Sequence, residues 1–511
     1  MKANNRFHRV ALFAFAAVFA GGARGELPPL CGDGVHDDTS AIQARLDSGA
    51  SLVYLPPPKK EYLISGTLRI GSDTELRLDP LTRIRLAPNS NCPMLQNRDW
   101  YYGTNVNVIV SGGIWDFDNL HQEPCPFDFI DDPTVSLGNA QGDGGADRSP
   151  KKRLPHPELD FWDPANVMPD WNQGILMRFS GMRNFTVKGI TLRNPTTYGL
   201  TLNHAVQFAI EHVTFSYDTW NPRPLCMDGV HLDSNCHYGR IAHLRGTARD
   251  DMVALLAHDR WFRGPITDVV IEDIAVAEPA FRAVRLLSRS HESPVKRIVI
   301  RDVRGKFYTD VVGFTRFWGG GDARGLIEDV LVENLHVSRV QPPDDIRKAL
   351  NWALGSRRNS PLFQFQGGID VGRAVFRNIV REETDIGSPT FWFNQPAKAR
   401  EIVLRDVRMV NRTGKAIQFF DGFGEVEKVV VDNVAYDGAW TNHPHACGAW
   451  KGGAWKASAP AADGNPGAAA GEFRGDSPHP AGTSLLFEQG TGCTLDESYP
   501  FQSRAVRPNL A

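Results

Sequence analysis

Three aspartates stand at the beginnings of two short apolar segments. Asp228 begins DGVHL, and Asp250 and Asp251, 22 and 23 residues further on, begin DDMVAL. Carboxyl groups that are crowded together raise the pKa of at least one of them, which keeps a proton available for acid catalysis. An ionised neighbour can then polarise water, and hydrolysis of a glycosidic bond needs such an acid and base. These aspartates are the leading candidates for catalytic residues, although aspartate also begins strands simply because it caps backbone amides.

A repeated pattern indicates how the three aspartates are positioned. From residue 185, a β-branched run, a polar or small residue and an apolar residue recur at intervals of 23 to 44 residues, with the alternation of half-buried strands. The recurring apolar residues are Ile190, Val213, Leu244, Ile274, Val303, Leu335, Ile379, Val407 and Val434. Most intervals are too short for a propeller blade of roughly 40 or more residues, so the pattern predicts a parallel β-solenoid.

The solenoid explains the spacing of the aspartates. Neighbouring strands lie about 4.8 Å apart, so residues one coil apart are near neighbours. Asp228 and the pair Asp250–Asp251 can therefore share one site. Adjacent strand residues face opposite ways, so both members of the pair reach solvent only at the start of a strand or on a bulge.

The ends of the chain differ from this repetitive middle. Residues 1–25 combine a basic start, eleven apolar residues and a small-residue stretch, which is typical of a signal peptide and too short to span a membrane comfortably. We therefore expect a secreted or periplasmic protein without a membrane span after cleavage. A net charge of −3 provides no electrostatic reason to bind nucleic acid.

The predicted organisation is a single all-β domain. It comprises a solenoid over residues 26–437, a loop insertion at about 115–175, and a loop-rich C-terminal cap over 438–511. A short helix, capped by Thr39 or Ser40 and reaching Leu46, would cover the open N-terminal end. Seven cysteines are too few for a disulfide scaffold; pairing of Cys226 with Cys236, or of Cys447 with Cys493, stays open.

Two stretches carry a family resemblance. GDGVHDDTSAIQARLD with VYLPPPKKEYLIS resembles the opening of the pectate-lyase-like superfamily of right-handed parallel β-helices, and DGVHL followed by DDMVAL resembles the active site of family 28 glycoside hydrolases. The resemblance implies inverting hydrolysis of a pectic or related acidic polysaccharide without metal or cofactor. Asp250 would be the general acid, while Asp228 and Asp251 would hold and activate water.

The sequence departs from that family around the aspartates. Cys226-Met227 replaces Asn-Thr, Arg249 replaces a glycine, and AFRAVRLLS stands where Gly-His-Gly is expected. The Arg-x-Lys that grips a galacturonate carboxylate is absent; the nearest arginines are Arg285 and Arg316. The acids are therefore retained while the substrate-binding motifs are changed.

Other candidates for substrate contact are less specific, since each has an ordinary structural explanation as well. They are His204, His231, His258, Arg282, Arg285 and Arg316. Trp115, Trp162, Trp171, Trp220 and Trp261 could stack on sugars or anchor loops.

Two other functions remain open. One is a calcium-dependent polysaccharide lyase on the same fold, with the aspartates as metal ligands and Arg249, Arg282 or Arg285 as base. The other is a non-catalytic carbohydrate-binding β-helix, which would expose rows of aromatic side chains. The sequence says nothing about oligomeric state or about endo- or exo-action.

Overall fold

The computed structural model describes residues 26–100, 104–122, 174–218, 227–257, 263–316, 324–343 and 360–457. The chain divides into a compact unit, Met1–Ser458, and a second unit, Ala459–Ala511. All of the described residues belong to the first unit. The predicted signal peptide (1–25) lies outside them, as do most of the predicted insertion and the long loops that interrupt the repeat.

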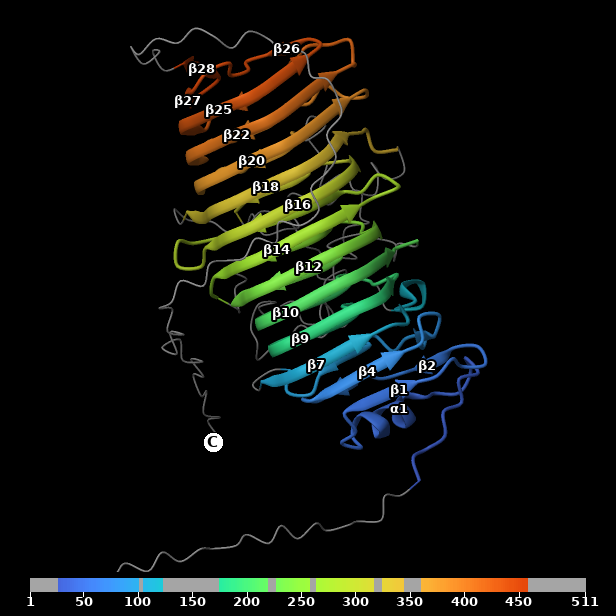
Figure 1. The fold of residues 1–511 in the computed structure, drawn as a ribbon. Helices are drawn as coiled ribbons and strands as arrows, with labels where there is room; N and C mark the ends of the chain where they lie inside the picture. The colour runs from blue at the N-terminus through green and yellow to red at the C-terminus, as the bar shows by residue number, and fades with distance from the viewer. Residues whose placement is uncertain are drawn as a thin grey trace, which may run out of the picture. The chain divides into compact units, whose positions relative to one another are not determined.

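The first unit is a right-handed parallel β-helix, as predicted, in which successive coils stack strand upon strand (Figure 1). One column, here called the short-strand sheet, contains β3 (Leu68–Ile70), β6 (Leu95–Asn97), the first residues of β9 (Met177–Arg193) and β10 (Leu200–Ser216), β11 (Val230–Asp233), β13 (Asp251–Leu256), β15 (Arg282–Leu287), β17 (Val312–Thr315), β19 (Phe363–Phe365), β21 (Phe391–Phe393) and β24 (Phe420–Gly422).

The long strands form the rest of each coil. They are β1 (Leu52–Leu55), β4 (Thr74–Leu78), β7 (Asn105–Ser111), the later residues of β9 and β10, β12 (Cys236–Thr247), β14 (Ile266–Ala275), β16 (Val295–Phe307), β18 (Gly325–Arg339), β20 (Ile369–Glu383), β22 (Lys398–Asn411) and β25 (Glu425–Asp437). Near the N-terminus a third column contains β2 (Tyr62–Ile64), β5 (Arg83–Leu86) and β8 (Ile114–Asp116).

The recurring apolar residues of the sequence repeat form one continuous column. Each of the nine, from Ile190 to Val434, is the register partner of the next. All but Val434 are buried. The predicted repeat is therefore the physical coil, and its core is shared between neighbours.

The polar or small residue before each of these apolar residues bends its long strand. All nine have left-handed backbone, with φ between 51° and 64°: Gly189, His212, His243, Asp273, Asp302, Asn334, Asn378, Asp406 and Asn433. Glycine, asparagine and aspartate tolerate this conformation best. Their side chains also join coils, because the Asn378 amide donates to Asn334 (2.9 Å) and the Asn334 amide to Asp302 (3.2 Å).

The N-terminal end is covered by α1 (Thr39–Leu46), which confirms the predicted helix. Its Ile42 and Leu46 are buried against the first coils. The Gln43 amide accepts from the backbone N–H of Arg69 (2.8 Å) and donates to its carbonyl (3.1 Å), so this side chain pairs with the open edge of β3. The N-cap is Asp38 rather than Thr39 or Ser40; its carboxylate accepts from the backbone of Cys31 and Gly32 instead of from the helix.

Regular structure extends into both regions that the sequence analysis assigned to loops. Trp115 lies in β8 and is fully buried, so it is a core residue and not a sugar platform. A 3₁₀ turn, η1 (Asn119–His121), follows. After β25 the chain forms β26 (Trp440–Thr441), which pairs with β23 (Ile417–Gln418). β27 (Gly448–Lys451) and β28 (Ala454–Ala457) then add to the edge of β25 as an antiparallel hairpin.

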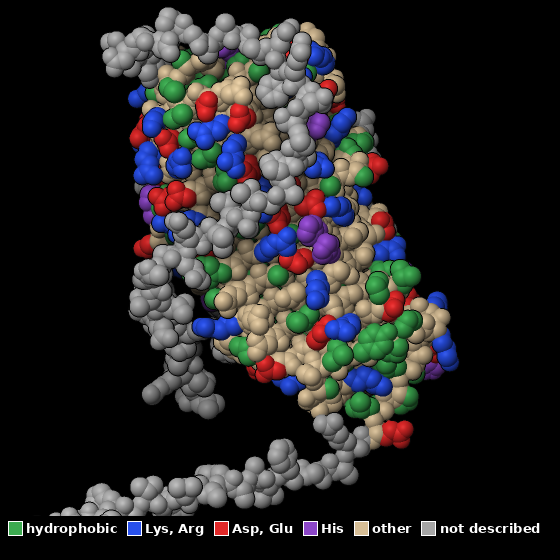
Figure 2. Space-filling model, in the orientation of Figure 1, with side chains coloured by type: hydrophobic (Ala, Val, Ile, Leu, Met, Phe, Trp, Pro, Cys, Tyr) green, Lys and Arg blue, Asp and Glu red, His purple; other side chains and the backbone are tan. Residues whose placement is uncertain are grey.

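Cys236 and Cys447 are free cysteines, so neither disulfide considered above is formed in this structure. Within the described ranges, no helix is long and apolar enough to cross a membrane. On the face seen in Figure 2, acidic and basic side chains are interspersed rather than separated by sign. Cross-coil ion pairs account for part of this pattern: Arg240, for example, bridges Glu211 and Glu272 on the coils to either side.

Candidate active site

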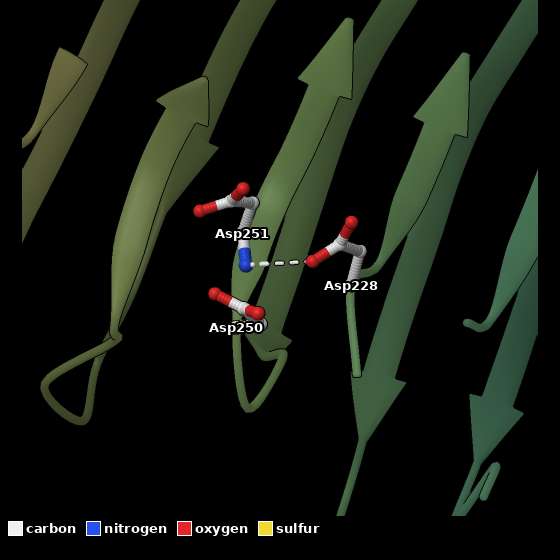
Figure 3. A group of neighbouring side chains, drawn as sticks. All are labelled: Asp228, Asp250 and Asp251. Atoms are coloured by element: carbon white, nitrogen blue, oxygen red, sulfur yellow. Dashed lines mark hydrogen bonds between the residues drawn. The ribbon is translucent and has the colours of Figure 1, made fainter. Parts of the chain in front are cut away.

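The three aspartates converge at the start of neighbouring short strands (Figure 3). Asp251 is the first residue of β13, Asp250 precedes it, and Asp228 lies two residues before β11, whose Val230 pairs with Val253. One carboxylate oxygen from each lies within 4.8 Å of the others. The Asp251 N–H donates to Asp228 Oδ1 (3.1 Å), and the Gly229 N–H donates to the Asp251 carbonyl (2.9 Å). These backbone bonds fix the two strand starts relative to each other, which is the placement that the sequence predicted.

Gly229 allows this close approach. A Cβ at this position would lie 2.5 Å from Phe215 Cζ and 2.7 Å from the Met252 carbonyl oxygen. Neither the backbone oxygen nor the packed ring has room to move. A glycine directly after Asp228 is therefore required for its strand to pack beside β13.

Asp250 has the features of a general acid. Its side chain is half-buried, and in the described part of the chain no hydrogen bond to its carboxyl group is formed. Burial, followed by the nearby charges of Asp251 and Asp228, raises the pKa of Asp250 well above its ordinary value. A carboxyl group in such a setting keeps its proton near neutral pH and can donate it.

Asp251 is held by a buried arginine. Arg282 Nη1 donates to Asp251 Oδ1 (2.5 Å), while Arg282 Nε and Nη2 donate to the two oxygens of Asp310 (2.8 and 2.9 Å). All three side chains are buried. Burial raises the pKa of Asp251, and Arg282 counteracts that rise. Asp251 is therefore the member of the adjacent pair that ionises more easily.

Asp228 is held by a buried histidine. His231 Nδ1 lies 2.7 Å from Asp228 Oδ2, and its Nε2 lies 3.3 Å from Asp233 Oδ1. The imidazole stacks on Tyr198, with ring centroids 4.4 Å apart. Burial lowers the pKa of His231, but Asp233 and Asp228 outweigh it and raise the value to about 10.

Two of the predicted substrate-binding residues therefore form buried ion pairs with the aspartates. His231 and Arg282 are 6% and 2% exposed, and each is occupied by two carboxylates. The sequence offered both as candidates for substrate contact, but in the structure neighbouring side chains cover them. Both residues position catalytic candidates instead.

The remaining predicted residues are spread over a wider area. Arg285 is partly exposed, with Nη1 3.9 Å from Asp251 Oδ2 and Nε donating to Thr315 (3.2 Å), so it can still reach a substrate. His204 lies within β10, where its backbone is left-handed, and its Nε2 is 3.1 Å from the amide nitrogen of Asn235. Arg316 packs against Gly368 beyond the end of β17. His258 lies outside the described residues, as do Trp162, Trp171, Trp220 and Trp261.

Asp310 was missed, although the sequence contains a signal for it. It precedes the apolar run VVGF, just as Asp228 and Asp251 precede theirs. Extending the register by two coils places Asp228, Asp251, Arg282 and Asp310 at equivalent positions. Along the stack, two aspartates are thus followed by the arginine and then by a third aspartate. Asp233 and Tyr198, which hold His231, have no comparable signal.

The same aspartates were tested as a metal site. Three carboxylate oxygens within 4.8 Å suit a divalent cation by distance alone. However, both oxygens of Asp228 already accept hydrogen bonds, and Asp251 is paired with Arg282. A guanidinium and an imidazolium beside the cluster also repel a cation. The residues therefore fit a metal poorly.

The fold is a parallel β-helix, as the sequence repeat predicted. No protein-family model matches the chain, and no curated protein sequence matches it. Solved structures with similar coils include an exopolygalacturonase from Thermotoga maritima, at 14% identity and a TM-score of 0.47 over 83% of this chain and 93% of that one.

Two other similar structures differ in their reported roles. One is a family 28 exopolygalacturonase from Yersinia enterocolitica, at 15% identity and a TM-score of 0.42 over 80% of this chain and 77% of that one. The other is PfbA, a surface adhesin of Streptococcus pneumoniae, at 12% identity and a TM-score of 0.41 over 80% and 88%. At these identities no residue role is transferred from them.

Proposed function

We propose that this protein is a glycoside hydrolase that cleaves a pectic or related acidic polysaccharide. The observation that carries the proposal is the contrast between two adjacent carboxyl groups. Burial and the neighbouring aspartates raise the pKa of Asp250 well above its ordinary value, whereas Arg282 counteracts the rise in the pKa of Asp251. Hydrolysis of a glycosidic bond needs one carboxyl group that donates a proton and one that accepts a proton. The polygalacturonases among the similar structures are compatible with this proposal but do not support it by themselves.

In the proposed reaction Asp250 donates its proton to the leaving glycosidic oxygen. Asp228 and Asp251 hold the attacking water, and Asp251 accepts its proton. Arg282 occupies Oδ1 of Asp251, which leaves Oδ2 as the oxygen that faces the reaction. Asp228 is committed through both oxygens, to the Asp251 N–H and to His231, so it orients water rather than attacking sugar. Water attack in one step inverts the anomeric configuration.

The distance between the carboxyl groups bears on whether the product inverts or retains its anomeric configuration. Inverting enzymes usually hold the two carboxyl groups about 6.5–9.5 Å apart, and retaining ones about 5–5.5 Å. The oxygens here approach within 4.8 Å. We infer inversion because both oxygens of Asp228 accept hydrogen bonds, and because the proposal assigns the remaining oxygen of Asp251 to accept the proton of the attacking water. Proton NMR of the first product formed decides between the two outcomes.

The proposal is tested by product analysis with the wild type and Asp250→Asn. On polygalacturonate, rhamnogalacturonan and algal polysaccharides, we expect new reducing ends without the ultraviolet absorbance of unsaturated uronates, and no effect of EDTA. Asp250→Asn should lower the rate about 10²–10⁴-fold. Asp302→Asn is the matched control. Asp302 has left-handed backbone, and the next coil has an asparagine, Asn334, at the equivalent position, so the fold should accept asparagine there.

Other results would identify one of the alternatives. Unsaturated products that disappear with EDTA would refute hydrolysis and assign the site to a calcium-dependent lyase, in which the partly exposed Arg285 is the candidate base. Binding of a polysaccharide without any product would leave a carbohydrate-binding β-helix. We further propose that residues 1–25 direct export, which amino-terminal sequencing of the secreted protein tests.

A further inference from the structure

Two arginines, Arg178 and Arg69, lie on the short-strand sheet on the N-terminal side of the aspartates. Arg178 on β9 is the register partner of Gln96 on β6, and Gln96 is the partner of Arg69 on β3. On the other side, Arg178 pairs with Thr201, and Thr201 pairs with His231. Arg178 is therefore two strands, or about 10 Å, from the histidine that holds Asp228. A polysaccharide lying along the stack would reach Arg178 with a different sugar from the one being cleaved.

Arg178 is a half-buried cation without an acidic partner. Its Nε donates to Gln96 Oε1 (2.9 Å), and its guanidinium carbon lies 4.1 Å from the centre of the Trp100 ring. Among the described residues, no carboxylate or carbonyl accepts a hydrogen bond from its two Nη atoms. Burial lowers the pKa of Arg178 to about 10; Cys92 opposes this shift, and the nearby charge of Arg69 adds a smaller lowering. Arg178 therefore stays charged at neutral pH.

The fully buried arginines of the described residues differ from Arg178 in their partners. Arg282 and Arg381 are each paired with a carboxylate, and Arg339 donates to four backbone carbonyls. Partial burial of a charge is costly unless a partner compensates for it. For Arg178 the chain provides a hydrogen-bonding amide and an aromatic face, which orient the guanidinium, but it provides no anion.

Arg69 extends the positive surface. Its side chain is exposed and forms no ion pair in the described part of the chain, while Gln43 fixes its backbone on both sides. Arg69 lines an open hollow of about 520 Å³ together with Gln43, Asp47, Thr67 and Arg98. The acid of this hollow, Asp47, is already paired with Arg98. The local balance is therefore positive.

We propose that Arg178 and Arg69 form an anion-binding subsite for an acidic sugar of the bound polysaccharide. Guanidinium groups bind carboxylate and sulfate in the same forked geometry, so the anion is either a uronate carboxylate or a sulfate ester. This subsite rests on the proposed function in one respect, because it takes the short-strand sheet as the substrate face. It places recognition of acid on the N-terminal side of the aspartates, in a chain that lacks the Arg-x-Lys of the family it resembles.

Binding is tested in an Asp250→Asn background, where the polysaccharide is not consumed. Calorimetry with oligogalacturonates, with their fully methyl-esterified forms and with sulfated oligosaccharides separates the possible ligands. We expect Arg178→Gln to weaken binding of the acidic oligomers about 10–100-fold, and Arg69→Gln to weaken it less. Neither change should affect the esterified forms. The class of oligomer that loses affinity shows whether a carboxylate or a sulfate is bound.

The controls separate this subsite from the overall fold and from the reaction. Arg77→Gln removes an exposed arginine on β4, outside the short-strand sheet, and should leave binding unchanged. Circular dichroism and thermal unfolding check that Arg178→Gln is folded, and exposed Arg69 provides a second variant with little structural risk. Equal affinity in Arg178→Gln and its parent, or equal losses for acidic and esterified oligomers, would overturn the subsite.

The two proposals can fail separately. Binding of acidic oligomers that depends on Arg178, in a wild type that cleaves nothing, would keep the subsite and reject hydrolysis. Cleavage of polygalacturonate with the same KM in the wild type and in Arg178→Gln would keep hydrolysis and reject the subsite.

Discussion

Replacement of Arg282 by glutamine tests whether Arg282 favours the ionised form of Asp251. The guanidinium and the Asp251 carboxylate are in direct contact, and two charges roughly 4 Å apart attract each other by about 4 kcal/mol at an effective dielectric constant of 20. Without Arg282 the pKa of Asp251, which burial already raises, should rise further. Because the base must be ionised, the acidic limb of the pH–rate profile should move upward by the same amount. Activity lost at neutral pH would then be recovered in part at alkaline pH.

The same substitution leaves Asp310 buried without its partner, which costs about 3–5 kcal/mol of stability. The double variant Arg282→Gln/Asp310→Asn removes that second charge and keeps the test on Asp251. Arg240→Gln is the matched control, because Arg240 also bridges two carboxylates but lies on β12, partly exposed to solvent. The measurement is kcat/KM from pH 4 to 10 on whichever polysaccharide the wild type cleaves. A profile of unchanged shape, lowered equally at every pH, would refute this reasoning.

Three further predictions follow from the site and the core. His231→Gln should lower activity, and its stability deficit relative to the wild type should be greatest below about pH 6.5 and should disappear as the pH rises through about 10, because the pKa of His231 is raised in the folded state; urea unfolding at pH 6, 8 and 10 measures this. Gly229→Ala should cost about 1–3 kcal/mol and displace Asp228, since its Cβ meets Phe215 and the Met252 carbonyl; thermal unfolding and kcat check both effects, and full activity in the variant would contradict them. Ile274→Ala, in the buried apolar column, should cost about 2–5 kcal/mol without changing KM, and a large change in KM would show that the column is coupled to the site.

The sequence predicted the coil because the pattern is local and repeated. A left-handed polar residue followed by a buried apolar one recurs in every coil, so single intervals such as Val303 to Leu335 measure the coil directly. The placement of Asp228 beside Asp251 followed from the same interval. Each of these predictions needed only the order of residues and the spacing of strands.

The partners of the aspartates were harder to predict, because they depend on side-chain packing between coils. Arg282 was considered only as a substrate contact, since nothing in AFRAVRLLS shows that Asp310 will take the other side of its guanidinium. His231 was expected to face outward, which it does, but Tyr198 covers it. Arg178 was not predicted, because the insertion separates it in the sequence from Gln96, its register partner in the preceding coil.

The in-register column from Ile190 to Val434 means that equivalent positions recur once in each coil along the stack. Distances along the short-strand sheet can change only by whole coils, in steps of about 4.8 Å. Removing or duplicating one coil between Arg178 and Asp228 would therefore move acid recognition by one step relative to the cleavage point, with every other contact unchanged. If the proposed subsite and cleavage site are right, product length would depend on the number of coils between them. A chimeric chain with a different product length could then be designed by adding or removing whole coils.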